Sequence, residues 1–148
     1  IVKSDAIVFS PGPGLPSKAG MMEQIIELYK NKKKMLGVCL GHQAIGEVFG
    51  ASVVHSGEII HGDATPLNIV ENGGIFNSIP SGTPVGRYHS WIISNANFPS
   101  VLKVTATDSQ GVIMAIRHMH YEITGVQFHP ESIMTPMGEK MIKNWLSV

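Results

Sequence analysis

The architecture of this chain can be predicted from one segment, Met35-Leu36-Gly37-Val38-Cys39-Leu40-Gly41-His42-Gln43. Residues 35–38 form a short apolar run of the kind that fills a strand buried on both faces of a parallel sheet. Residues 41–49 have the composition of the helix that follows such a strand, and Gly50 ends it. Cys39, the only cysteine of the chain, is therefore predicted to lie at a sharp turn between a strand and a helix.

Cys39 has a glycine two residues away on either side, in the pattern Gly37-x-Cys39-x-Gly41. This is the spacing of a nucleophile elbow with cysteine in place of serine, because glycines let the backbone bend tightly and let a substrate approach. At such a turn the thiol points out of the sheet beside the positive end of a helix, which favours the thiolate. The alternative is a buried structural cysteine, which is the commoner role of a lone cysteine.

The composition is that of a small domain without a strongly charged surface. The chain has 148 residues, with 11 acidic and 11 basic side chains, so one domain over residues 1–148 with a sizeable core is expected. The balanced charge argues against a nucleic-acid partner, and no apolar run is long enough to predict insertion into a membrane. A single cysteine fits a reducing compartment, which predicts a cytoplasmic location.

A second glycine-rich turn follows the first expected strand, residues 6–10. Gly12 and Gly14 alternate with prolines there, and glycine N–H groups at the end of a parallel strand suit an anion or an oxyanion. An ordinary strand-to-helix turn is the alternative. Ser17 can cap the next helix, which is expected to run to about Lys33.

After the helix that follows Cys39, the pattern changes to short strands broken by glycine, asparagine and proline, expected at residues 52–54, 65–70 and 83–87. These strands suggest a small antiparallel extension of the sheet. His55 and His61 lie between the first two strands, but no third ligand stands at a useful spacing. A solvated loop is therefore expected there in place of a metal site.

Residues 88–91, Tyr-His-Ser-Trp, come at the end of the last of these strands. All four side chains can hydrogen-bond or stack, which is typical of the wall of a ligand pocket near a sheet edge. The alternative is an ordinary strand end.

His129 and Glu131 directly follow the strand expected at residues 123–128. Residues two apart in extended backbone point the same way, so the two side chains can lie side by side above the end of this strand. A carboxylate beside an imidazole fixes its tautomer and stabilises its charged form. A structural histidine is the alternative. The chain closes with an amphipathic helix expected at residues 138–146.

Three features therefore fall at the carboxyl ends of expected strands: Cys39, the pair of His129 and Glu131, and the glycine turn after the first strand. In an open α/β sheet these ends share one rim, where ligands bind. His129 could serve as base for the thiol, with Glu131 orienting the imidazole. The N–H groups of Gly14 and Leu40 could stabilise an oxyanion. The predicted reaction is acyl transfer to cysteine and then to water.

Four motifs resemble those of class I, or triad, glutamine amidotransferases: Ser-Pro-Gly-Pro-Gly at 10–14, Gly-Val-Cys-Leu-Gly-His-Gln at 37–43, Arg-Tyr-His-Ser at 87–90 and Gly-Val-Gln-Phe-His-Pro-Glu-Ser at 125–132. The third motif, with Ser-Gly-Glu-Ile-Ile-His-Gly at 56–62, most resembles the glutaminase components of anthranilate synthase and aminodeoxychorismate synthase. The resemblance implies an α/β fold with an open, mostly parallel sheet flanked by helices and a small antiparallel extension. The family's opening strand and helix have no counterpart here, so a single glutamine amidotransferase domain without them is expected.

The resemblance also implies a function. The protein is expected to hydrolyse L-glutamine to glutamate through a glutamyl-thioester and to supply the ammonia to a chorismate-binding synthase subunit, without a cofactor. A catalytic triad of Cys39, His129 and Glu131 is implied. Further residues are implied to surround the reacting carbonyl and the bound glutamine, namely Gly12, Gly14, Leu40, Gln43, Ser90 and Trp91. Trp91 departs from the family, which usually has leucine after that serine.

Two alternatives share parts of this pattern. Another cysteine hydrolase of similar fold, such as a γ-glutamyl hydrolase or a peptidase, would keep the cysteine elbow. It would lack the Tyr-His-Ser wall and the Pro-Gly-Pro-Gly turn. An inactive regulatory subunit would keep the fold, although the presence of all three triad residues argues against it.

Overall fold

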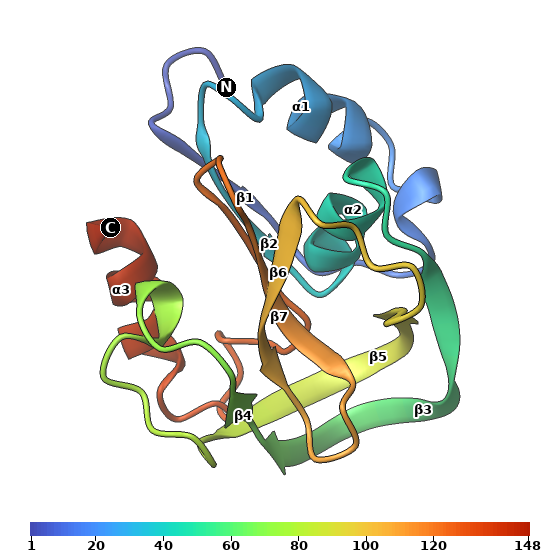
Figure 1. The fold of residues 1–148 in the computed structure, drawn as a ribbon, viewed down its shortest axis with the longest axis vertical. Coiled ribbons are helices and arrows are strands. Elements are labelled where there is room, and N and C mark those ends of the chain that lie inside the picture. Colours follow the sequence, from blue (N-terminus) through green and yellow to red (C-terminus); the bar gives the residue numbers. More distant parts are fainter.

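The computed structural model describes residues 1–148. Strands and helices alternate in the first third of the chain, and strands dominate from there to the final helix (Figure 1). The strands are β1 (Ala6–Phe9), β2 (Lys34–Val38), β3 (Val53–Pro66), β4 (Asn68–Ile69), β5 (Pro84–Ile93), β6 (Leu102–Thr107), β7 (Ile113–His118) and β8 (Ile123–Val126). The helices are α1 (Met22–Tyr29), α2 (Leu40–Val48) and α3 (Gly138–Ser147), with short 3-10 helices η1 (Pro16–Lys18) and η2 (Gly74–Phe76).

One sheet of six strands has the order β1-β2-β8-β7-β6-β4. β1 pairs with β2 and β2 with β8 in parallel, whereas β7, β6 and β4 continue the sheet in antiparallel fashion. β8 is distant from β2 in sequence but lies next to it, with Gly125 in register with Gly37. The predicted α/β class with an open sheet is confirmed. The carboxyl ends of β2 and β8 therefore meet at one edge.

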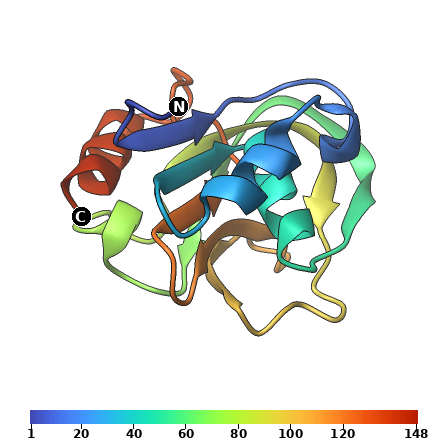
Figure 2. The ribbon, with the colours of Figure 1, turned by 90° about the horizontal axis from the view of Figure 1, so that it is seen from above.

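Helices cover both faces of this sheet. α1 and α2 lie on one face, and α3 with η2 lies on the other, as Figures 1 and 2 show from two directions. Each face has its own apolar core. Ile26 and Ile45 pack on the side of α2, and Phe76, Met141 and Trp145 pack on the side of α3. β2 is buried on both faces, as predicted, whereas β1 lies at the edge of the sheet and its Val8 is 56% exposed.

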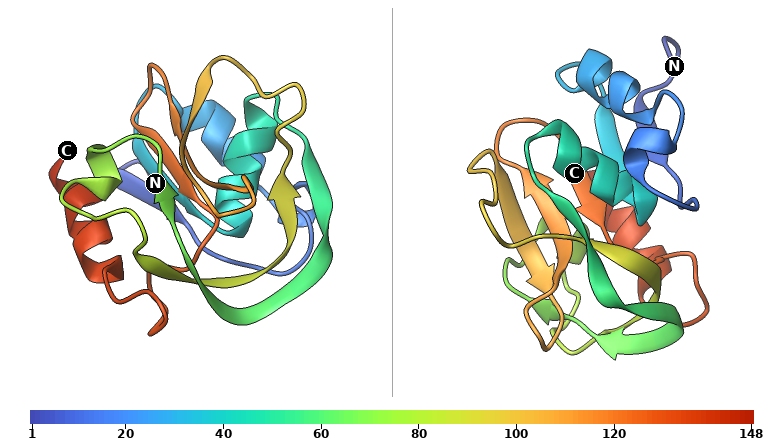
Figure 3. Two further views of the ribbon diagram at one scale, coloured as in Figure 1. Left: turned by 60° about the horizontal axis from the view of Figure 1, so that its bottom comes forward. Right: turned by 90° about the vertical axis from the view of Figure 1, so that its right-hand side faces the viewer.

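β3 and β5 form a separate antiparallel ribbon, which passes across the carboxyl ends of the parallel strands (Figure 3). The expected antiparallel extension is confirmed, but its strands differ from the expected ones. Residues 55–62 belong to the 14-residue strand β3 and are not a loop. Gly57 and Gly62 have φ of 86° and 84°, and the register shifts between His55 and Ile60 and again after His61. Bulges of this kind need glycine, which looks like a strand break in the sequence.

One expected helix detail was wrong. Ser17 lies in η1 and does not cap α1, whose N-cap is Met21. Gly20, with φ of 68°, separates the two helices. At the other end of the chain, Leu146 is 62% exposed, while Met141 and Trp145 are buried. None of the helices combines the length and the apolar character that a bilayer-spanning segment needs.

Candidate active site

Cys39 lies at the junction of β2 and α2 in a backbone conformation that side chains rarely adopt. Its φ is 54° and its ψ is −100°, outside the regions that residues with a Cβ normally occupy. Hydrogen bonds on both sides hold this conformation. The Cys39 N–H donates to the Val126 carbonyl at 2.8 Å, and the Cys39 carbonyl accepts from the Gln43 N–H at 3.1 Å. A strained residue held by β8 and by the first turn of α2 is typical of a functional site.

The two glycines beside Cys39 let the start of α2 lie directly on the strands. A Cβ on Gly37 would lie 2.4 Å from the carbonyl of Gly41, and a Cβ on Gly41 would lie 2.4 Å from the carbonyl oxygen of Phe9. Both contacts are with backbone atoms, so no side-chain rotation could relieve them. The predicted elbow is present, and the close approach that its glycines allow is between α2 and its own sheet.

The thiol of Cys39 is buried, and burial raises its pKa to about 11. The backbone N–H of Leu40 at the start of α2 lowers this pKa, as predicted, but burial is the larger effect. The predicted effect of the turn is therefore present, but burial outweighs it and the protonated thiol is favoured at neutral pH. The sulfur contacts the carbonyl oxygen of Tyr88 at 3.9 Å and the Nε2 of Gln127 at 3.6 Å.

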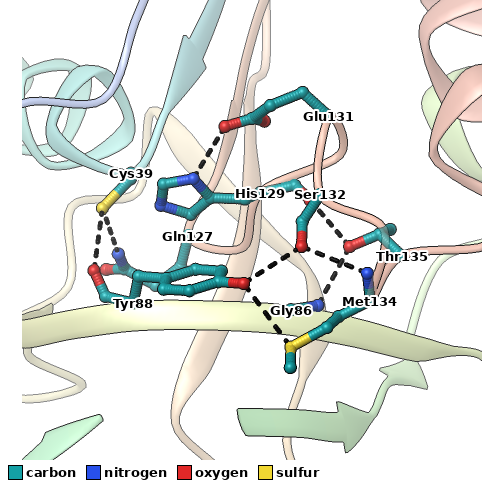
Figure 4. Close-up of polar contacts among 9 residues, drawn as sticks. All are labelled: Cys39, Gly86, Tyr88, Gln127, His129, Glu131, Ser132, Met134 and Thr135. Carbon is teal, nitrogen blue, oxygen red and sulfur yellow. Dashed lines mark hydrogen bonds and ion pairs between the residues drawn. The ribbon is translucent and has the colours of Figure 1, made fainter. Parts of the chain in front are cut away.

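His129 and Glu131 lie side by side after β8, as predicted. The Nδ1 of His129 is 2.7 Å from a carboxylate oxygen of Glu131. Figure 4 shows the imidazole between Glu131 and Cys39, with the second ring nitrogen directed toward the sulfur. That nitrogen, Nε2, is buried and has no hydrogen-bond partner. The Nε2 of His129 is therefore available to exchange a proton with the thiol or with a substrate atom beside it.

The backbone of His129 is attached to β5. Its N–H donates to the carbonyl of Gly86 at 3.0 Å, and its carbonyl accepts from the hydroxyl of Thr135 at 2.7 Å. The ring of Tyr88 packs against the imidazole with 4.9 Å between the ring centres. These contacts restrict the position and the rotation of the imidazole from two sides.

A cavity of about 220 Å³ opens beside the sulfur. Five of the six residues expected to surround glutamine line it together with Cys39, namely Gly12, Gly14, Gln43, Ser90 and Trp91. Leu40 is not in the cavity wall. Its backbone N–H lies against the sulfur, and its side chain would be 2.9 Å from a Cβ on Gly12. The structure therefore brings the glycine turn, the elbow and β5 together around one small space.

Other residues around this site were not expected from the sequence. Ile59, Ile60 and His61 of β3 line the cavity, because residues 55–62 pair with β5. Gln127 contacts the sulfur directly. Gln127 lies in the bend that follows β8, and no local pattern in the sequence indicates its contact with the sulfur.

A larger cavity of about 340 Å³ lies near the amino ends of β2 and β8. It is lined by segments around η2 and the β7–β8 turn, and neither Cys39 nor His129 reaches it. The smaller cavity is distinguished by Cys39 in its wall, because the imidazole paired with Glu131 is directed toward this sulfur. That arrangement can generate a thiolate by proton transfer and attack a carbonyl carbon.

Comparison with known proteins agrees with this geometry. The model of the family "Glutamine amidotransferase class-I" matches residues 1–148. The chain belongs to this family. Among class I glutamine amidotransferases, it is 40% identical over 146 residues to aminodeoxychorismate synthase component 2 of Escherichia coli, covering 98% of this chain and 77% of that protein.

Some longer proteins contain a segment that is similar to this chain. The chain is 43% identical over 143 residues to the bifunctional protein TrpGD of Thermotoga maritima, covering 96% of this chain but only 24% of that protein. Its fold is similar to the crystal structure of a Thermoplasma acidophilum protein described as part of a GMP synthase, with a TM-score of 0.87 at 28% identity. That comparison covers 98% of this chain and 72% of the other.

Proposed function

We propose that this amidotransferase hydrolyses the side-chain amide of L-glutamine and supplies the ammonia to a synthase subunit that uses chorismate. The observation that supports the hydrolysis is the arrangement of Cys39, His129 and Glu131 at one rim of the sheet (Figure 4). Relatives named as components of anthranilate synthase and aminodeoxychorismate synthase support the chorismate-using partner. The cytoplasm is the proposed location.

The first chemical step is proton transfer within the triad. Because the pKa of the buried thiol is about 11, the sulfur does not ionise on its own at neutral pH. The unpartnered Nε2 of His129 accepts the proton, and Glu131 stabilises the resulting imidazolium through Nδ1. The sulfur then attacks the amide carbon of glutamine and a carbon–sulfur bond forms.

The second step releases ammonia. The amide oxygen becomes an oxyanion, which the N–H groups of Leu40 and the turn at Gly14 stabilise. His129 returns its proton to the amide nitrogen, the carbon–nitrogen bond breaks and a glutamyl-thioester remains. Water, deprotonated by His129, attacks the thioester and releases glutamate and the free thiol.

Replacing the nucleophile tests this proposal. Cys39→Ser is expected to lower glutamine hydrolysis at least about a thousandfold, because a hydroxyl is a much weaker nucleophile beside the same base. The complex of this variant with its synthase should still form product when ammonium salt replaces glutamine. Glutamate release measures the hydrolysis of glutamine, and the product of the synthase measures the reaction with ammonium salt. Turnover of glutamine near the wild-type rate would show that the triad is wrongly assigned.

The same assay separates the alternatives. Wild-type protein is tested on glutamine, on γ-glutamyl peptides and on casein, with Cys39→Ser as the blank. Hydrolysis of glutamine alone supports the amidotransferase proposal, whereas faster cleavage of a γ-glutamyl peptide or casein supports another cysteine hydrolase. No hydrolysis in any arm, with or without the synthase, supports an inactive subunit.

A further inference from the structure

Two buried glutamines connect the wall of the cavity to the nucleophile. Gln43 on α2 is 2% exposed and Gln127 after β8 is fully buried. The Nε2 of Gln43 lies 2.9 Å from the carbonyl oxygen of Trp91 and 3.2 Å from the Oε1 of Gln127. The Nε2 of Gln127 then lies 3.6 Å from the sulfur of Cys39. A continuous row of hydrogen bonds therefore leads from β5 to the sulfur.

The direction of this row follows from its first member. A backbone carbonyl can only accept hydrogen bonds, so Gln43 must turn its NH₂ group toward Trp91. The other hydrogen of this NH₂ group meets Gln127, which must therefore present its oxygen. The NH₂ group of Gln127 is left facing the sulfur of Cys39. The orientation of the Gln127 amide is thus determined by the network and not by choice between two equivalent rotamers.

A buried ion pair supports the same carbonyl from the other side. Asp108 and the Nη1 of Arg87 are 2.9 Å apart, and the Nε of Arg87 donates to the Nε2 of His89 at 3.1 Å. Arginine has donors only, so the proton of the neutral imidazole is on Nδ1. This Nδ1 lies 3.2 Å from the carbonyl oxygen of Trp91. The carbonyl oxygen of Trp91 therefore accepts from both His89 and the NH₂ group of Gln43. The reversed amide of Gln43 would place its own oxygen against this acceptor.

We propose that Gln127 is a preoriented hydrogen-bond donor to the sulfur of Cys39, which stabilises the thiolate that forms during the reaction. The thiol can donate to the Tyr88 carbonyl at 3.9 Å, but after it loses its proton this contact joins two acceptors. The donor from Gln127 then becomes a charge-assisted hydrogen bond, which is stronger than a neutral one. The consequence for catalysis rests on the proposed glutaminase function, whereas the contact itself does not.

Several titratable side chains surround the thiol and must be separated from this effect. They are His42 on α2, His61 on β3, Tyr88 and His89 on β5, and His129 and Glu131 after β8. All of them are retained when Gln127 alone is changed. A difference between the wild-type protein and a Gln127 variant therefore reports the amide and not these groups.

The test is the pH dependence of alkylation of Cys39 by iodoacetamide, measured on the Cys39 peptide by mass spectrometry. Gln127→Met keeps a side chain of similar length but removes the donor. We expect the midpoint of the rate profile to rise by about one pH unit and alkylation at neutral pH to slow about tenfold, the usual size of a hydrogen bond to a charged group. Gln24→Met, an exposed glutamine on α1, is the matched control and should keep the wild-type midpoint. An unchanged midpoint in folded Gln127→Met overturns the proposal.

Two further measurements cover the case in which Gln127→Met does not fold. Gln127→Glu retains an acceptor for Gln43 but turns a second oxygen toward the sulfur, so the midpoint should rise further than in the methionine variant. In wild-type protein, a pH titration is followed by NMR at the side-chain amide of Gln127 and by the ultraviolet absorption of the thiolate. The amide signal should shift over the same pH range in which the thiolate forms. An amide signal that does not move over this range also overturns the proposal.

None of these measurements needs glutamine. A shifted midpoint in a protein without glutaminase activity would support the contact and reject the proposed function. Glutaminase activity with an unshifted midpoint would support the proposed function and reject the role of Gln127. If both hold, Gln127→Met should lower kcat while leaving KM near the wild-type value, because Gln127 does not line the cavity.

Discussion

At Cys39 two influences act in opposite directions on the pKa of the thiol. The start of α2 offers the N–H of Leu40, which lowers the pKa, while burial raises it to about 11. A thiol in this position is inert toward solvent until a base removes its proton. We propose His129 as this base, because its unpartnered ring nitrogen is directed toward the sulfur in Figure 4.

Glu131 is predicted to matter less than Cys39. Its carboxylate lies 2.7 Å from the Nδ1 of His129, and its side chain is 58% exposed. Glu131→Gln keeps an oxygen that can accept from Nδ1 but loses the negative charge that stabilises the imidazolium. We expect kcat for glutamine to fall roughly a hundredfold, at the lower end of the contribution of general acid–base catalysis.

Steady-state glutamate release at saturating glutamine measures this change. Glu139→Gln, which alters an exposed carboxylate on α3 paired with Lys143, is the control and should leave kcat unchanged. A loss from Glu131→Gln that equals or exceeds the loss from Cys39→Ser would contradict the ranking of the two residues.

At the scale of elements, the elbow depends on direct backbone contact between α2 and the strands under it. Gly37 on β2 and Gly41 on α2 leave no room for a side chain, because the nearest atoms are backbone atoms at 2.4 Å. β2 is held between β1 and β8 by parallel pairing. α2 therefore cannot be displaced without moving Cys39 relative to β8 and His129.

Gly41→Ala is expected to destabilise the fold by about 1–3 kcal/mol, the range for overpacking in a rigid core. The new methyl group would meet the carbonyl of Phe9. Gly46→Ala, on the same helix, is a graded control, since its methyl group would meet the end of the Ile93 side chain at 2.5 Å. That side chain can rotate, so a smaller loss is expected. Urea unfolding measures both, and equal stability of Gly41→Ala and wild type would argue against rigid contact at the elbow.

At the scale of the whole molecule, burial lowers the pKa of three imidazoles, those of His42, His89 and His118. Burial lowers the pKa of His42 to about 3, and burial with the nearby Arg87 lowers the pKa of His89 to about 4. Both are well below the ordinary value of 6.5. Glu47 acts in the opposite direction, because burial and the neighbouring Glu23 raise its pKa to about 7.

These shifts predict a loss of stability on acidification below about pH 6.5. In that range the unfolded chain binds protons on His42 and His89, whereas the folded chain does not, so protons favour the unfolded state. Each histidine contributes a fall of about 1.4 kcal/mol per pH unit. Glu47 binds its proton more tightly in the folded state, so it offsets part of this slope. The free energy of unfolding in urea, measured from pH 7 to pH 4.5, gives the net slope.

His42→Leu should flatten this slope by the contribution of one histidine, because leucine does not titrate. Gln24→Leu, at an exposed position that does not titrate, is the control and should leave the slope as it is. Glu47→Gln should make the slope steeper. A slope that His42→Leu leaves unchanged would mean that His42 is not excluded from protons in the folded protein.

Much of the candidate site could be predicted from local sequence. The apolar run before Cys39, the glycines beside it and the two-residue spacing of His129 and Glu131 are short-range signals that follow strand and turn geometry. The carboxyl-end rule for parallel strands then brought the three features to one rim. The extent of β3 could not be predicted in this way, because Gly57 and Gly62 resemble strand ends and only pairing with β5 shows that they are bulges.

The amino-acid sequence by itself determines where the strands, the elbow and the charged pair lie along the chain, since alternation, glycine spacing and turn chemistry act over a few residues. Only the tertiary structure decides which strands become neighbours. The adjacency of β2 and β8 brings Gln127 to the sulfur of Cys39. The covering of the elbow by β5 buries that sulfur and reverses the predicted direction of its pKa shift. Burial and through-space contact depend on atoms distant in sequence, which no local pattern encodes.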